Sequence, residues 1–125
     1  MIADTAFLSD FHREREEVRR GPASAFLAAH RRAATFATVI SAGELAVIFN
    51  SNAVARAFLG PYRVLRLTPE IALAAAEIDR ELIRSGRRLG ENDNWIAGFC
   101  RYYGQPLISR DRAFDRVPGL RRLNY

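Results

Sequence analysis

Residues 35–49 read Thr-Phe-Ala-Thr-Val-Ile-Ser-Ala-Gly-Glu-Leu-Ala-Val-Ile-Phe, and they carry the clearest indication of the fold. The first part, Thr35 to Ile40, is rich in β-branched and aromatic side chains, which predicts a buried strand. Ser41 with Glu44 three residues later is the pattern of a capping box, which predicts that a helix begins there. A buried strand that leads directly into a helix is typical of a βαβ unit and favours a parallel sheet.

The same succession of strand and helix continues on both sides of this stretch. Short apolar or alternating runs predict further strands at residues 1–3, 62–67, 106–109 and 120–123. Helical spacing of apolar residues, with Gly and Pro as boundaries, predicts helices at residues 6–12, 22–32, 50–59, 68–86 and 90–104, and one helical turn at 111–114. The sequence therefore predicts one α/β domain over residues 1–125, with a mainly parallel central sheet of about four to five short strands and helices on both faces.

Length and composition restrict the possible functions. The chain has 125 residues, of which 49% are hydrophobic, which suits one globular core and leaves no room for two domains. The formal net charge is +5, and every basic side chain is Arg, because the sequence contains no Lys. Arg suits phosphates and carboxylates, so nucleic acid or an acidic protein is a candidate partner, although biased codon usage explains the Arg excess equally well. The absence of Lys excludes a Walker A lysine, a Schiff base and a receiver-type lysine.

Cellular location is predicted from what the sequence lacks. No apolar run is long enough to cross a bilayer, and the first residues do not resemble a secretory signal. The single cysteine, Cys100, cannot form an internal disulfide and is expected to be a small core residue. We therefore expect a cytoplasmic protein without a membrane partner.

Four acidic residues fall at the predicted ends of strands or at the starts of the helices that follow them. They are Asp4, Glu44, Asp93 and Asp111. In open parallel sheets, ligands bind outside the carboxyl ends of the strands, so we expect these four side chains to lie at one edge. Clustered carboxylates repel one another unless a cation holds them, and Mg²⁺ or Mn²⁺ prefers such oxygen ligands. A metal bound there can activate water for phosphodiester cleavage.

Each of the four acids also has an ordinary structural interpretation. Glu44 fits the third position of a capping box, and for this residue alone that interpretation is the stronger one. Asp93 fits the favourable interaction of an acid with a helix N-terminus. Asp4 and Asp111 fit the caps of the turns that follow them. We favour a site because all four are predicted to meet at one edge of one sheet.

Four short motifs contain the four acids. In order, they are Asp4-Thr5-Ala6-Phe7-Leu8, Ser41-Ala42-Gly43-Glu44-Leu45, the run from Gly90 to Ala97, and Ser109-Arg110-Asp111 followed by Phe114 and Val117-Pro118-Gly119-Leu120. The ordered set resembles the motifs of the PIN-domain family, and within it the VapC-type toxins of VapBC toxin–antitoxin pairs. Together the four motifs cover essentially the whole chain. Ala6 stands where the family often has a polar residue, and Ser41 stands in place of the usual Thr.

The resemblance implies an endoribonuclease that depends on Mg²⁺ or Mn²⁺. Its metal-binding and catalytic acids would be Asp4, Glu44, Asp93 and Asp111, with Thr5 and Ser109 as supporting polar residues. It further implies a homodimer that cleaves structured RNA, such as tRNA or ribosomal RNA, and that a cognate antitoxin neutralises, with residues 50–59 as a groove for that partner. Asp115 remains a second candidate for the fourth acid.

Arg87 and Arg88, together with Arg110, are candidates to hold RNA phosphates beside the acids. A solvated loop is an equally good interpretation of Arg87 and Arg88. Three other functions remain as alternatives: a catalytically silent RNA-binding or scaffolding domain on the same fold, a phospho-acceptor receiver domain, and a structure-specific DNase. The missing Lys argues against the receiver domain, and a need for divalent metal would separate a nuclease from a silent binding domain.

Overall fold

Five short parallel strands form the centre of the protein. The computed structural model describes all residues from Met1 to Tyr125. The strands are β1 (Ile2–Ala3), β2 (Phe36–Thr38), β3 (Arg63–Leu65), β4 (Leu107–Ile108) and β5 (Arg122–Leu123). Their order in the sheet is β3-β2-β1-β4-β5, and every neighbouring pair is parallel. The predicted parallel sheet and the number of strands are confirmed.

Six α-helices and one 3₁₀ helix connect the strands. They are α1 (Thr5–Glu16), α2 (Pro22–Ala29), α3 (Val39–Ile48), α4 (Asn52–Leu59), α5 (Pro69–Arg84), α6 (Glu91–Tyr103) and η1 (Arg112–Arg116). None of the helices combines the length and the apolar character that crossing a bilayer requires. Each predicted helix is present, with ends that differ by a few residues from the prediction.

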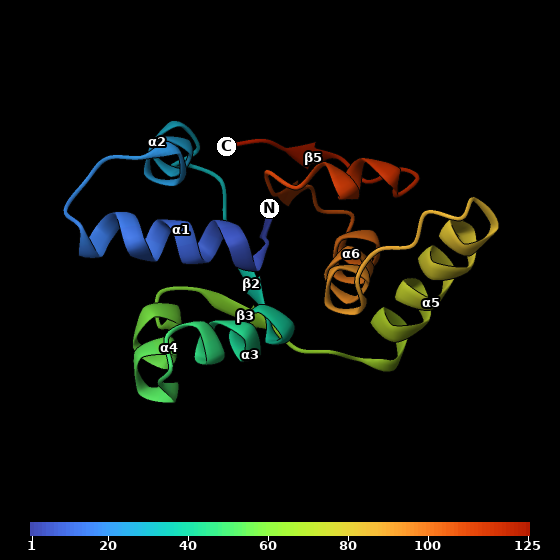
Figure 1. The fold of residues 1–125 in the computed structure, drawn as a ribbon, viewed down its shortest axis with the longest axis horizontal. Helices are drawn as coiled ribbons and strands as arrows, with labels where there is room; N and C mark the ends of the chain where they lie inside the picture. Colours follow the sequence, from blue (N-terminus) through green and yellow to red (C-terminus); the bar gives the residue numbers. More distant parts are fainter.

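The helices cover both faces of the sheet, and the alternation of side chains along the strands explains how. Successive residues of a strand point to opposite faces. Ala3 and Ile108 therefore pack with α1 to α4, whereas Ile2 and Leu107 pack with α5 and α6. Figure 1 shows α3 and α4 on one side of the strands and α5 and α6 on the other.

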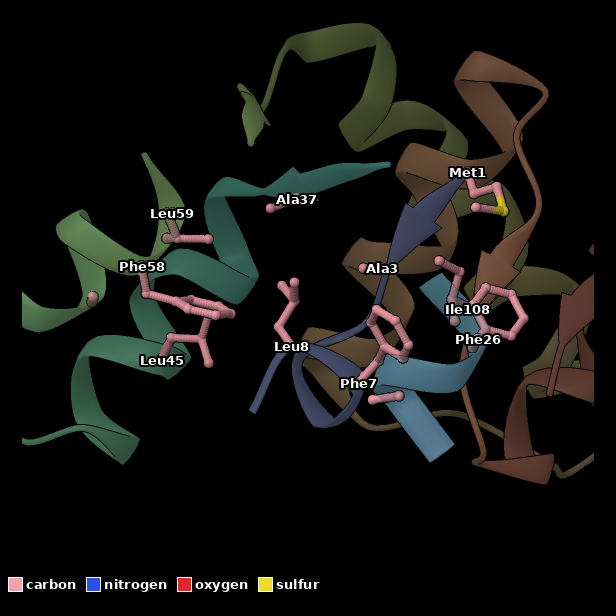
Figure 2. Packing of buried hydrophobic residues seen from close by; sticks show 12 residues of the cluster. Met1, Ala3, Phe7, Leu8, Phe26, Ala37, Leu45, Phe58, Leu59 and Ile108 are labelled. Atoms are coloured by element: carbon pink, nitrogen blue, oxygen red, sulfur yellow. The ribbon is translucent and has the colours of Figure 1, made fainter. Parts of the chain in front are cut away.

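Each face of the sheet has its own hydrophobic cluster. On the first face, Phe7 and Leu8 of α1 are fully buried and lie between the strands and the side chains of the other helices, including Leu45 and Phe58 (Figure 2). On the second face, α5 and α6 approach so closely that a Cβ added to Gly98 would lie 2.7 Å from the Cβ of Ala75. This close contact fixes α6, which carries Asp93 at its start.

The start of α3 differs from the prediction. Thr38, not Ser41, caps this helix, because its hydroxyl accepts a hydrogen bond from the Ser41 backbone N–H at 3.1 Å. The helix begins at Val39, so the strand is shorter than predicted and Glu44 lies in the second turn. The capping-box interpretation of Ser41 and Glu44 is therefore wrong, and the side chain of Glu44 is free for another role.

Candidate metal and nuclease site

The four predicted acids lie around the point where the connections of the sheet change direction. β1 is the central strand, and the chain runs from it first to β2 and β3 and later to β4 and β5 on its other side. Such a switch point leaves a crevice at the carboxyl ends of the two strands that flank it. Asp4 directly follows β1, and Asp111 follows β4 after two intervening residues.

Asp4 is the most buried of the four acids, with 4% of its surface exposed. It caps α1, because its Oδ1 accepts a hydrogen bond from the Phe7 backbone N–H at 2.6 Å. Burial raises the pKa of Asp4 to about 6, and the negative charge of Asp93 adds to this rise. The Ser109 hydroxyl, the Phe7 N–H and the charge of Arg110 only partly oppose it. The ordinary interpretation as a cap is thus confirmed, but it leaves a buried carboxyl without a full counter-charge.

Glu44 projects from α3 into a small network of hydrogen bonds. The Thr5 hydroxyl donates to its Oε2, and the Asn92 side-chain amide donates to its Oε1 at 2.8 Å. These three residues come from the starts of α1 and α6 and from α3, so the network ties together three elements at the carboxyl edge of the sheet. Thr5 lies where a supporting polar residue was predicted.

Asp93 lies in the first turn of α6 and is partly buried. Burial raises its pKa, and the charges of Asp111 and Glu44 raise it further. Asp93 thus interacts electrostatically with Asp111 and Glu44, and its charge in turn raises the pKa of Asp4. The four acids therefore form one electrostatic set, with Asp93 as its centre.

Asp111 and Asp115 have different surroundings, which bears on the choice of the fourth acid. Asp111 is exposed; it caps η1 through the Ala113 N–H at 2.7 Å, and its own N–H donates to the Ser109 hydroxyl at 3.0 Å. Asp115 instead forms a two-pronged ion pair with Arg122, at 2.7 and 2.9 Å. Arg122 already compensates the charge of Asp115, so the structure favours Asp111 as the member of the set.

The donor chemistry of the set suits a hard divalent cation, although the side chains do not form a closed cage. All four donors are carboxylates; burial is the main cause of the raised pKa values of Asp4 and Asp93, and the charges of neighbouring acids of the set add to it. No three His, Cys, Asp or Glu side chains converge closely enough to surround an ion on their own. An open arrangement of oxygen donors fits Mg²⁺, which keeps several of its waters and needs few protein ligands.

The three arginines predicted to contact RNA have different partners. Arg88 forms a two-pronged ion pair with Asp79 of α5, at 2.8 and 2.6 Å. Arg87 is exposed. Arg110 lies between Ser109 and Asp111 and forms an ion pair with Asp10 of α1 at 2.7 Å. Of the three, Arg110 is directly adjacent in the chain to a member of the acidic set.

Two residues of this region were not identified from the sequence. Asn92, which holds Glu44, directly precedes Asp93, and nothing in its type or spacing marks it apart from the motif that contains it. Asp10 is 7% exposed and lies three residues after the buried Phe7, so helical spacing places it on the inner face of α1. Its inward-facing position in a predicted helix was therefore the feature of the sequence that could have identified Asp10.

Fold and acidic edge together define an α/β protein with a carboxylate site at its topological switch point. A family model described as "PIN domain" matches residues 1–120. The chain therefore belongs to the PIN domain family, as the resemblance of its motifs indicated.

Curated relatives are similar over part of their length. Ribonuclease VapC2 from Haemophilus influenzae is 38% identical over 74 residues, which cover 58% of this chain and 56% of that protein. The tRNA(fMet)-specific endonuclease VapC from Salmonella typhimurium is 33% identical over 70 residues, covering 55% of this chain and 53% of that protein. The chain thus spans about half the length of the curated relatives that it matches.

Solved structures share the fold over nearly the whole chain. VapBC2 from Rickettsia felis, bound to a DNA fragment from its promoter, superimposes with a TM-score of 0.81 at 18% identity, covering 98% of this chain and 96% of that one. VapBC-1 from nontypeable Haemophilus influenzae gives a TM-score of 0.78 at 20% identity with the same coverage of both chains. At these identities the likeness shows the fold.

Proposed function

We propose that this protein is a divalent-metal-dependent endoribonuclease and the toxin of a two-component toxin–antitoxin pair. The observation that carries the proposal is the electrostatic set at the switch point, in which Asp4 and Asp93 have raised pKa values and no basic side chain compensates Asp93. The nuclease activity of the relatives named VapC supports the same reaction class.

Each site residue has a distinct part in the proposed reaction. Asp4, Glu44, Asp93 and Asp111 would hold Mg²⁺ or Mn²⁺, while Thr5 and Asn92 keep both oxygens of Glu44 oriented. A bound divalent cation would supply the positive charge that activates a water and stabilises the leaving oxygen of a phosphodiester. Ser109 supports the loop that carries Asp111, because its hydroxyl accepts the Asp111 N–H. No side-chain nucleophile is required.

The substrate class and the partners follow from charge and from the relatives. A net charge of +5 without any Lys suits binding to a polyanion through Arg. Because one relative is named for its action on tRNA(fMet), we propose structured RNA, such as tRNA or ribosomal RNA, as the substrate. We further propose a cognate antitoxin as a protein partner, since solved neighbours include a toxin–antitoxin complex from Klebsiella pneumoniae and a member of the VapBC family of toxin–antitoxin systems from Mycobacterium tuberculosis. The homodimer is proposed from the family resemblance of the motifs.

Cleavage of RNA in the presence and absence of metal tests this proposal. Wild type and Asp93→Asn are incubated with purified tRNA, ribosomal RNA and a DNA duplex, each with MnCl₂ or with EDTA. We expect wild type to cut RNA only with Mn²⁺ and Asp93→Asn to be inactive while keeping its circular-dichroism spectrum. RNA binding without any metal-dependent cutting by wild type would instead identify a silent RNA-binding domain, and cutting of DNA alone would identify a DNase.

A further inference from the structure

Asp10 is a buried carboxylate that lies outside the acidic set and holds three side chains. Its Oδ1 accepts from Arg13, one turn later on α1, at 2.7 Å. Its Oδ2 forms an ion pair with Arg110 at 2.7 Å and accepts a hydrogen bond from the Tyr125 hydroxyl at 2.9 Å. Asp10 therefore connects α1 with the loop after β4 and with the end of β5.

The charges at this position do not cancel. Two guanidinium groups, those of Arg13 and Arg110, share the single negative charge of Asp10. The nearby carboxylate of Glu14 accepts hydrogen bonds from the backbone N–H groups of Ala23 and Ser24, so its oxygens face the start of α2. Two guanidinium groups therefore pair with one carboxylate at Asp10, and Glu14, which lines the same pocket, directs its charge toward the start of α2.

A pocket of about 170 Å³ opens at this cluster. Its lining includes Asp10, Glu14, Tyr125 and three arginines, Arg13, Arg19 and Arg110. The side chains of Arg13 and Arg110 are each 58% exposed, whereas that of Asp10 is 10% exposed. A buried acid therefore orients guanidinium groups whose remaining N–H donors are accessible, which is an arrangement suited to the oxygens of a phosphate.

The pocket lies near the acidic set. Arg110 is the residue between Ser109 and Asp111, and its charge already acts on Asp4. Asp10 follows Asp4 by six residues on α1, which corresponds to about 9 Å along the helix. An RNA strand with one phosphate at the acids would have a neighbouring phosphate within reach of this pocket.

We propose that Arg13 and Arg110, held in place by Asp10, form a subsite for an RNA phosphate adjacent to the one that is cut. This inference rests on the proposed function and deepens it, because it assigns where the substrate backbone is held. Tyr125 and Asp10 are positioning residues in this subsite, and the two arginines contact the phosphate.

RNA binding in an inactive background tests the subsite without interference from cleavage. The parent is the Asp93→Asn protein, and the probe is a fluorescein-labelled single-stranded oligoribonucleotide of mixed sequence, followed by anisotropy in EDTA from 50 to 300 mM KCl. Arg13→Gln and Arg110→Gln are each expected to weaken binding about tenfold at low salt. Each is also expected to reduce the slope of log Kd against log[KCl] by about 0.7, the value for one phosphate contact with a single strand.

Arg32→Gln is the matched control. It removes the same charge from an exposed position before β2, at the opposite edge of the sheet from the acids. We expect a change of less than about twofold in Kd for this variant. Equal effects of Arg32→Gln and Arg110→Gln would show that only the overall charge matters and would overturn the proposal.

Asp10→Asn separates positioning from simple electrostatics. Loss of a negative charge makes the protein more basic, so a purely electrostatic account predicts tighter RNA binding. The subsite predicts weaker binding by severalfold, because the two arginines lose the carboxylate that orients them. Tighter binding by a folded Asp10→Asn protein would refute the positioning role. If this variant does not fold, Tyr125→Phe takes its place, because it removes one hydrogen bond to Asp10. Tyr125→Phe is expected to weaken RNA binding as well, and unchanged binding by this variant would refute the positioning role.

Failure of this inference is distinguishable from failure of the proposed function. Metal-dependent cleavage by wild type, with normal RNA binding by both arginine variants, would leave the nuclease intact and reject the subsite. Absence of cleavage by wild type, with the expected losses in binding, would reject the nuclease and keep a phosphate subsite on an RNA-binding domain.

Discussion

Replacing Asp4 with Asn is expected to make the metal-free protein more stable at neutral pH, although Asp4 belongs to the proposed metal site. Asn caps helices about as well as Asp, so the hydrogen bond from the Phe7 N–H to the cap of α1 is retained. The substitution removes a carboxylate whose pKa burial raises from 3.8 to about 6. Each pKa unit corresponds to about 1.4 kcal/mol, so the rise costs the folded protein about 3 kcal/mol once Asp4 is ionised.

The pH dependence of this gain follows from the direction of the shift. The unfolded chain loses the Asp4 proton near pH 3.8, whereas the folded protein keeps it until about pH 6. Asp4 therefore costs no stability below pH 3.8, an increasing amount between pH 3.8 and 6, and the full amount above pH 6. The gain of Asp4→Asn over wild type should be close to zero at pH 3.5 and about 3 kcal/mol at pH 7.5.

Urea unfolding in EDTA, followed by the fluorescence of Trp95, measures both values. Asp115→Asn is a suitable control, because Asp115 is exposed and its pKa is lowered by the hydrogen bond from Arg122, so this variant should gain no stability at pH 7.5. A difference between Asp4→Asn and wild type that is the same at pH 3.5 and 7.5, or a less stable Asp4→Asn protein at pH 7.5, would show that Asp4 is not a destabilised buried carboxylate.

Three other substitutions test the packing, the caps and the choice of the fourth acid. Gly98→Ala should destabilise the protein by about 1–3 kcal/mol in urea unfolding, because the new Cβ would lie 2.7 Å from that of Ala75. Gly43→Ala is the control: this position is also inside a helix, but no atom lies within 4 Å of the new Cβ. That substitution should be neutral or stabilising by up to about 1 kcal/mol. Glu14→Gln should lose more stability at pH 7 than at pH 3, because hydrogen bonds from Ser24, Ala23 and Gly21 outweigh burial and hold the pKa of Glu14 below its ordinary value. The stabilising effect of the carboxylate therefore decreases as the pH falls toward that pKa, and equal losses at both pH values would contradict this. Asp111→Asn should lower RNA cleavage by at least about 100-fold whereas Asp115→Asn retains it, and the reverse order would make Asp115 the fourth acid.

Local signals in the sequence predicted most of the fold. The cap at Thr68 begins α5 where the sequence indicated, with the Thr68 hydroxyl accepting from the Ile71 N–H. The left-handed Gly104, at φ +60°, ends α6 where the sequence indicated. Apolar runs such as residues 107–108 are strands because they are buried on both faces. The start of α3 was misplaced because Thr38 and Ser41 are both good caps, and only the sheet, which ends at Thr38, decides between them.

The sequence placed Asp4 and Asp111 after strands and Asp93 at a helix start, as the structure has them, whereas Glu44 lies one turn further into its helix than expected. The interactions of these acids could not be predicted, because they depend on residues distant in the sequence. Asn92 reaches Glu44 across 48 positions, and Asp10 meets Tyr125 across 115. Likewise, nothing in the local sequence indicates that Arg88 pairs with Asp79 or that Arg122 takes the charge of Asp115. These contacts separate side chains that are available to a ligand from those that are already satisfied.

Binding of Mn²⁺ to the native protein decides whether the acids form one metal site. Thermal unfolding of wild type and Asp93→Asn is compared after chelation, with and without MnCl₂. A ligand that binds only the folded state stabilises it by about 2.7 kcal/mol at 100 times its Kd. We predict this increase in the free energy of unfolding for wild type and none for Asp93→Asn; an equal response of the two proteins, or no response by wild type, would contradict the assignment of Asp93 and its neighbours as metal ligands.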